Sequence, residues 1–219
     1  MLKDVYSVFY YTVLIIGATI CMICFNKVDR PFKWVCVLII LTLSSELIAG
    51  YFSFHRKNNG IVYVIFTPVE YFVYAMVYKT FFNDKKWSKI LYFSVAFLIV
   101  AEVINTIFFQ SAKKTPTNII DIESVLLVIL SLKLFINIRK KPVYENVLNE
   151  GVFWFNSAVL FYYSFDILFW GFHNIVFRLN NPPPIIYSGL LLFSGLLYIA
   201  YASSILLNFS AIKKTLKTG

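Results

Sequence analysis

Long apolar stretches alternate with short polar segments along the whole chain. Each stretch has about twenty residues, the length that an α-helix needs to cross the hydrocarbon core of a bilayer. We expect transmembrane helices over residues 5–25, 34–54, 61–82, 90–110, 118–138, 152–173 and 186–209. The polar segments between them are too short to form a second domain. The sequence therefore predicts an all-α, polytopic membrane protein with seven helices and a single domain over residues 1–219.

The composition supports a membrane protein and argues against a soluble enzyme. Of the 219 residues, 59% are hydrophobic and 14% are charged, whereas a typical soluble domain has roughly 45–50% apolar and 25% charged residues. The net charge of +9 comes from short clusters of Lys and Arg between the apolar stretches. Such clusters are typical of membrane proteins that hold to anionic lipid headgroups. We therefore expect the lipid bilayer as a partner, and no nucleic acid.

Basic residues are unequally distributed between the two ends of the predicted helices. Most Lys and Arg residues fall in the segments 27–33, 79–89, 139–141 and 213–217, and fewer fall in the alternate segments. Loops on the cytoplasmic side of membrane proteins carry an excess of Lys and Arg. We therefore expect the N-terminus outside and the C-terminus in the cytoplasm.

Six acidic residues interrupt the apolar stretches, and this orientation places all of them in the outer half of the membrane. They are Glu46, Glu70, Glu102, Asp121, Glu123 and Asp166. A charged residue at a helix centre costs roughly 2.5–3.5 kcal/mol on insertion and normally faces the bundle interior or a wet cavity. Asp121 and Glu123 lie in the first turns of their helix, where acids suit the helix dipole. The stronger candidates for a site are the other four.

Phenols and hydroxyls share helical faces with these acids. Tyr63, Thr67, Glu70 and Tyr74 recur at intervals of three or four residues, which places them on one stripe. We predict an outer cavity that binds a small cation or amine through carboxyls and aromatic rings. Its predicted lining is Glu46, Glu70, Glu102, Asp166, Tyr63, Thr67, Tyr74, Tyr162, Tyr198 and His173. Alternatively, the same acids have a structural role and form hydrogen bonds between helices without binding a ligand.

Metal-ligating side chains are few. The chain has two histidines, His55 and His173, and its three cysteines fall within or beside the first two apolar stretches. A catalytic zinc normally takes three protein ligands. We therefore predict no metal site, no catalytic residue and no cofactor, and we interpret the cysteines as packing residues.

Two segments resemble those of a group of uncharacterised multi-helix membrane proteins common in the Bacteroidota. The first comprises Asn58 and Asn59 followed by Tyr63, Phe66, Pro68, Glu70 and Tyr71. The second comprises residues 151–154, Gly-Val-Phe-Trp, followed by Phe-Tyr-Tyr at 161–163. The resemblance implies an integral protein of a bacterial inner (cytoplasmic) membrane, and it brings no settled activity.

The predicted cavity favours a receptor or sensor that binds a small cationic or amphipathic ligand from outside. Because the sequence predicts no soluble output domain, we expect such a receptor to signal to a separate partner protein in the cytoplasm or the membrane. Three alternatives stay open: a transporter or channel for a cation or small solute, an effector or accessory of a bacterial stress or anti-phage system, and an intramembrane hydrolase that uses paired carboxylates. Polar residues are scarce in the inner halves of the helices, which favours binding over conduction.

Overall fold

The computed structural model describes residues 2–139, 147–176 and 184–218. These residues form seven α-helices, and the described ranges contain no strand, so the predicted all-helical fold is confirmed. The helices are α1 (Leu2–Cys24), α2 (Arg30–Phe54), α3 (Gly60–Phe82), α4 (Lys85–Phe108), α5 (Thr117–Ile138), α6 (Gly151–Val176) and α7 (Pro184–Thr218). Short 3-10 turns at Phe25–Lys27 and Val147–Asn149 follow α1 and precede α6.

Several helices begin before the apolar stretches that predicted them. Asp29 precedes α2 in an extended conformation, and Pro31 occupies the first turn, a position that proline favours. At the start of α4, the Asp84 side chain accepts a hydrogen bond of 2.7 Å from the backbone N–H of Lys86. These signals lie in polar segments, so the hydrophobic pattern alone misses them.

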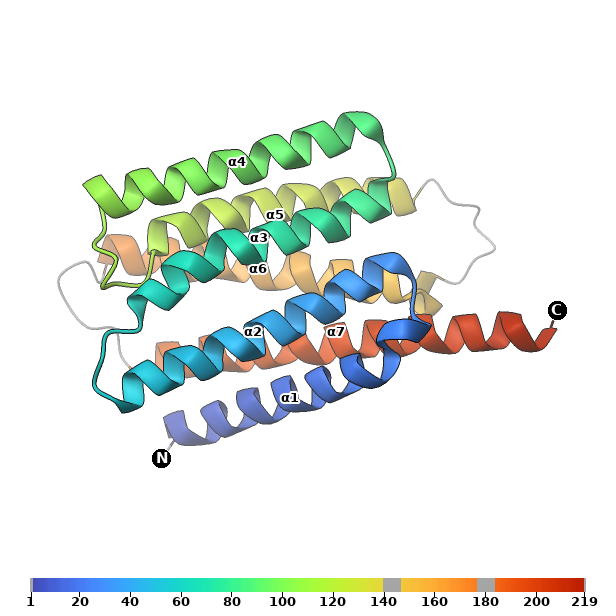
Figure 1. The fold of residues 1–219 in the computed structure, drawn as a ribbon, viewed down its shortest axis with the longest axis horizontal. Coiled ribbons are helices and arrows are strands. Elements are labelled where there is room, and N and C mark those ends of the chain that lie inside the picture. Colours follow the sequence, from blue (N-terminus) through green and yellow to red (C-terminus); the bar gives the residue numbers. More distant parts are fainter. Residues whose placement is uncertain (1, 140–146, 177–183, 219) are drawn as a thin grey trace.

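The largest difference from the predicted boundaries is at the end of α7, which continues to Thr218 instead of ending at Phe209. Residues 210–218 contain neither proline nor glycine, so no local signal ends the helix where the apolar stretch ends. Figure 1 shows this last part of α7 extending beyond the ends of the other helices.

Six of the seven helices, all except α5, are long and apolar enough to cross a membrane. Many large apolar side chains on their outer faces are exposed, such as Phe93 and Phe108 on α4, as expected for surfaces in contact with lipid. The 22 residues of α5 include three charged ones, Asp121, Glu123 and Lys133. The chain is therefore an integral membrane protein built as a helical bundle.

The helices do not pack in a simple circle. Five of them, α2, α3, α5, α6 and α7, surround the centre of the bundle, with α3 packed against α2 and α5, and α7 packed against α2 and α6. At one edge α1 packs on α2 and α7, and at the opposite edge α4 packs on α3 and α5 (Figure 1). The outer position of α4 decides which acids can share a cavity.

Two glycines let neighbouring segments approach closely. A Cβ atom at Gly60 would lie 2.6 Å from the carbonyl carbon of Lys113, and one at Gly151 would lie 2.3 Å from the carbonyl oxygen of Ser204. Next to Gly60, the side-chain amide of Asn58 donates a 2.7 Å hydrogen bond to the Lys113 carbonyl. The segment between α4 and α5 is thereby held against the start of α3.

Candidate functional site

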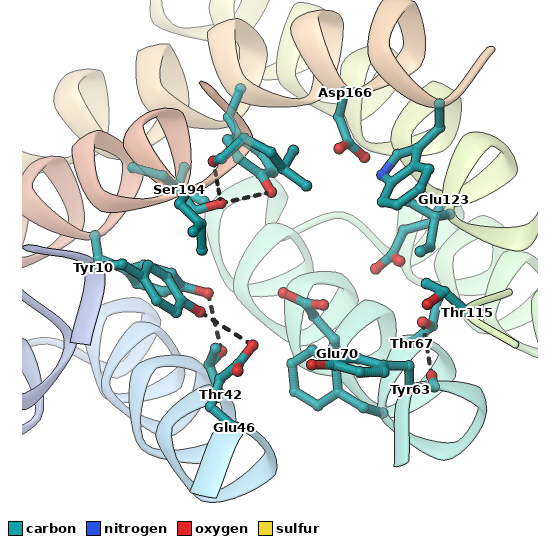
Figure 2. Close-up of a pocket in the computed structure, with 18 of the residues that line it drawn as sticks. Tyr10, Thr42, Glu46, Tyr63, Thr67, Glu70, Thr115, Glu123, Asp166 and Ser194 are labelled. Carbon is teal, nitrogen blue, oxygen red and sulfur yellow. Dashed lines mark hydrogen bonds between the residues drawn. The ribbon is translucent and has the colours of Figure 1, made fainter. Parts of the chain in front are cut away.

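A cavity of about 570 Å³ lies near the end of the bundle at which α1, α3, α5 and α7 begin. This volume is within the usual range of small-molecule sites, about 300–1,000 Å³. Residues of every helix except α4, together with Asn59 and Thr115 from the connecting segments, line it (Figure 2). Its polar and aromatic lining is Ser7, Tyr10, Tyr11, Thr42, Glu46, Asn59, Tyr63, Phe66, Thr67, Glu70, Thr115, Glu123, Tyr162, Tyr163, Asp166, Trp170, Ser194 and Tyr198.

Four carboxyl groups face this cavity, each from a different helix. They belong to Glu46 on α2, Glu70 on α3, Glu123 on α5 and Asp166 on α6. No Lys, Arg or His is among the described residues that line it. The cavity is therefore suited to a positively charged ligand, or to one rich in hydrogen-bond donors.

Glu46 is held by two phenols of α1. The hydroxyl of Tyr10 donates to Oε1 of Glu46 at 3.4 Å, and the hydroxyl of Tyr11 donates to Oε2 at 3.3 Å. On the same side of the cavity, the Tyr198 hydroxyl of α7 donates to Oγ1 of Thr42 at 3.1 Å (Figure 2). These bonds join α1, α2 and α7 around one wall.

The opposite wall is formed by α5 and α6. The Ser124 hydroxyl donates a 2.8 Å hydrogen bond to Oδ2 of Asp166, whose side chain is only 2% exposed. Glu123 is 3% exposed, and its Oε1 atom has no hydrogen-bond partner among the described residues. A buried polar atom without a partner is costly, so this carboxyl is positioned to accept a donor from a bound molecule.

Glu70 connects the two walls. Figure 2 shows its carboxyl between Glu46 and the pair formed by Glu123 and Asp166. It therefore lies near carboxyl groups of both walls. Glu70 is therefore placed to take part in cation binding together with a carboxyl of either wall.

Tyrosines close the cavity toward the middle of the bundle. Tyr163, which lines the cavity, packs edge-on against Tyr74 with ring centroids 5.6 Å apart. Behind it, the hydroxyls of Tyr74 and Tyr201 are hydrogen-bonded at 2.6 Å, and both side chains are fully buried. Deeper still, the Tyr78 hydroxyl donates to Oδ1 of Asn156 at 3.1 Å. We call Tyr74, Tyr78, Asn156 and Tyr201 the tyrosine layer.

The structure brings together seven of the ten residues predicted from sequence. Glu46, Glu70, Asp166, Tyr63, Thr67, Tyr162 and Tyr198 line the cavity. Their hydroxyls are partly engaged by neighbours, since Thr67 donates to the Tyr63 carbonyl at 2.9 Å and the Tyr162 and Ser194 hydroxyls lie 3.1 Å apart. A role of these residues in binding stays a prediction.

Three predicted residues lie elsewhere. Glu102 is on the outer helix α4, where it is buried and accepts a 3.0 Å hydrogen bond from the Thr106 hydroxyl. Tyr74 belongs to the tyrosine layer below the cavity. His173 lies on α6 one turn beyond Trp170, and the centroids of the two rings are 5.3 Å apart. Trp170 lines the cavity, but His173 is not among the described lining residues. The expectation that Glu102 shares a site with the other three acids is corrected by the position of α4.

Several lining residues were missed by sequence reasoning, and Glu123 is the most important. Its place in the second turn of α5 suggested a favourable interaction with the helix dipole. The missed signal is its helical spacing, because Glu123 shares a face with Ile119 and Leu127, both of which are buried. The same signal applies to Tyr10, which shares a helical face with the buried Leu14 one turn later.

Metal-ligating side chains do not gather in the part of the chain that the structure describes: it contains no group of three or more His, Cys, Asp or Glu residues placed to hold one ion. Cys21, Cys24 and Cys36 are buried free thiols on α1 and α2, and they are not among the lining residues of the cavity.

Comparison with known proteins identifies no relative. No family model matches the chain, and neither a curated protein nor a solved structure matches it. The resemblance to proteins of the Bacteroidota and the location in a bacterial inner membrane therefore stay predictions.

Proposed function

We propose that this chain is a receptor or sensor of the bacterial inner membrane that binds a small cationic or amphipathic ligand in its acidic cavity. The observation that carries the proposal is the lining itself, in which four carboxyls from four helices face one space and no described lining residue is basic. Carboxylates form charge-assisted hydrogen bonds with ammonium groups, and the faces of Tyr, Phe and Trp rings attract cations. An organic amine satisfies both kinds of group.

The proposed arrangement in the membrane has seven spans, with the N-terminus and the mouth of the cavity outside. The unequal distribution of Lys and Arg between the two ends supports this orientation. The charges of α5 are compatible with a span because Glu123 faces the cavity and the Lys133 ammonium lies 5.1 Å from the ring centroid of Trp87. Intramembrane charges normally face cavities or partners in this way.

Helix α7 is the element best placed to carry a signal. It contributes Ser194 and Tyr198 to the cavity and continues without interruption to Thr218. Lys213 and Lys214 are exposed near its far end, which extends beyond the bundle in Figure 1. A shift of α7 on ligand binding would therefore change the position of a basic surface that a partner protein could recognise.

The proposal can be checked by calorimetric titration of the protein in lipid nanodiscs with butylamine as the probe. We expect saturable binding to the wild type and at least a tenfold loss of affinity in Glu70→Gln, because the amide retains the shape but loses the charge. Glu102→Gln is the matched control, since Glu102 is a buried acid outside the cavity. The absence of saturable binding, or an equal loss in both variants, would contradict the proposal.

One observation favours a second candidate, a carrier that moves the cation across the membrane. A second cavity of about 510 Å³ lies at the other end of the bundle, and Phe32, Phe81 and Val152 are among its lining residues. Phe81 packs against Phe155, which packs against Tyr201 of the tyrosine layer, at centroid distances of 5.9 and 5.1 Å. The two cavities are therefore connected by a continuous series of buried or half-buried aromatic side chains.

Uptake of a labelled amine into proteoliposomes distinguishes the two candidates. The receptor predicts binding without net uptake, because the buried tyrosine layer closes the path. The carrier predicts uptake that saturates with amine concentration and is lost in Glu70→Gln. The hydrogen-bonded, fully buried Tyr74 and Tyr201 side chains favour the receptor.

A further inference from the structure

We propose that the ligand is an alkyl diamine, an extended molecule with an ammonium group at each end. This inference rests on the proposed function and specifies its ligand class. It follows from the division of the carboxyls between opposite walls of the cavity. Glu123 and Asp166 stand on α5 and α6, and Glu46 stands on α2. In the packing of the bundle, α3 lies between α2 and α5, and α7 lies between α2 and α6.

The first ammonium position is at Glu123 and Asp166. Both side chains are almost completely buried, and Oε1 of Glu123 has no hydrogen-bond partner within the described ranges. Ser124 supplies one donor to Asp166, at Oδ2. An ammonium group has three N–H donors and no acceptor, so it can bond to both carboxyls and compensate their charges together.

The second ammonium position is at Glu46. Tyr10 and Tyr11 donate to its two oxygens at 3.4 and 3.3 Å, which are long hydrogen bonds for O–H donors. A carboxylate offers about four acceptor positions, so two phenols leave room for a further donor. The Glu46 side chain is half-buried and faces the cavity, so this position is accessible to a ligand.

The cavity also has apolar lining, which suits a methylene chain. Leu190, Leu191 and Leu197 of α7 contribute apolar surface to the lining, and Phe66 contributes an aromatic ring. Glu70 lies between the two proposed ammonium positions (Figure 2). A single ammonium would compensate the carboxyls of one wall only, whereas a diamine reaches both walls.

A comparison of butylamine with putrescine, the diamine of the same chain length, tests the inference by titration calorimetry in nanodiscs. We expect putrescine to bind at least tenfold more tightly than butylamine to the wild type. Glu46→Gln is expected to weaken putrescine more than butylamine, so that most of the preference for the diamine is lost. Glu123→Gln is expected to weaken both, and Glu102→Gln to weaken neither.

The outcomes separate this inference from the function on which it rests. Equal wild-type affinities for putrescine and butylamine would overturn the diamine inference and leave cation binding intact. Equal weakening of both probes by Glu46→Gln would also overturn it, because the two walls would then act as one position. If neither amine binds the wild type, the proposed function itself fails. The wild-type comparison remains decisive even if a variant does not fold.

Discussion

The carboxyl groups that line the cavity receive few hydrogen bonds from the protein, which leaves them able to bind a donor. Asp166 receives a bond from Ser124, and Glu46 receives long bonds from two phenols. Oε1 of Glu123 receives none from the described residues. An unsatisfied buried acceptor costs roughly 1–3 kcal/mol, so a donor bound to Glu123 would stabilise the fold.

Glu123→Gln tests the contribution of this carboxyl to the stability of the fold and to amine binding separately. The amide removes a buried charge and adds an N–H donor, so we expect the free energy of unfolding without ligand to stay equal or rise by about 1 kcal/mol. The stabilisation caused by added amine should be lost. Thermal unfolding with and without butylamine measures the stability of each variant and its stabilisation by the amine, with Glu102→Gln as the control. Unchanged stabilisation by amine in Glu123→Gln would contradict the account.

Ser124→Ala is expected to destabilise the protein. The substitution removes the 2.8 Å hydrogen bond to buried Asp166, and losing one partner of a buried charged group costs roughly 1–3 kcal/mol. The exposed Ser164 on α6 provides the control, since its replacement by Ala should have little effect. The midpoint of chemical unfolding in the same lipid gives the comparison, and equal midpoints for the two variants would exclude a role for this bond.

The sequence predicts some of these residues better than others. Glu70, Thr67 and Tyr63 share one stripe of α3, and helical spacing alone brings them together. Glu102 has the same kind of spacing with Asn105, but it lies on a helix that packs outside the centre. The periodicity of one helix does not state which neighbours it meets, so residue patterns could not separate Glu102 from the cavity acids.

At the scale of elements, hydrophobic length identifies each helix but not its ends. All seven stretches correspond to helices, because in lipid every backbone polar group must be paired within the segment. The ends depend on other chemistry, such as the Asp84 cap of α4. The end of α7 lies as late as Thr218 because no proline or glycine ends the helix earlier.

Gly60→Ala is expected to destabilise the protein, because Gly60 packs closely against the segment between α4 and α5. The new Cβ would lie 2.6 Å from the Lys113 carbonyl carbon, so the segment that carries Thr115 into the cavity would have to move. We expect a loss of about 1–3 kcal/mol in stability together with weaker amine binding. Gly50→Ala on α2 is the control, because a Cβ there meets nothing within 4 Å and alanine favours a helix by roughly 0.5–1 kcal/mol. Similar behaviour of the two variants would argue against this contact.

The tyrosine layer is expected to stabilise the contact between α3 and α7 without binding the ligand. Tyr74→Phe removes one partner of the 2.6 Å bond to Tyr201 and leaves a buried hydroxyl unpaired, at a cost of roughly 1–3 kcal/mol. Amine affinity should change by less than about twofold, because Tyr74 lies below the cavity. A large loss of affinity with normal stability would instead place Tyr74 in the site.

At the scale of the whole molecule, the packing order of the helices was not predictable from their sequences. In a soluble protein the exposed face of a helix is polar, so the pattern reveals which side packs inward. Here the outer faces are apolar as well, because they face lipid. The position of α4 outside the central helices therefore emerges only from the structure.

The orientation of the molecule can be measured by labelling single cysteines introduced at Asn58 and at Lys214. We expect an impermeant thiol reagent to reach position 58 from outside the cell and position 214 only after the membrane is opened. The native Cys21, Cys24 and Cys36 are buried, so the wild type gives the background signal. The reverse pattern of labelling would place the acidic cavity on the cytoplasmic side.

The most direct measurement of the central claim is an experimental structure in lipid nanodiscs with putrescine added. The account predicts an extended ligand in the cavity, with one end at Glu123 and Asp166 and the other at Glu46. It also predicts that Glu102 remains in its contact with Thr106. A dry cavity with the carboxyls sealed in helix contacts, or a ligand bound elsewhere, would contradict the claim that these acids form a binding site.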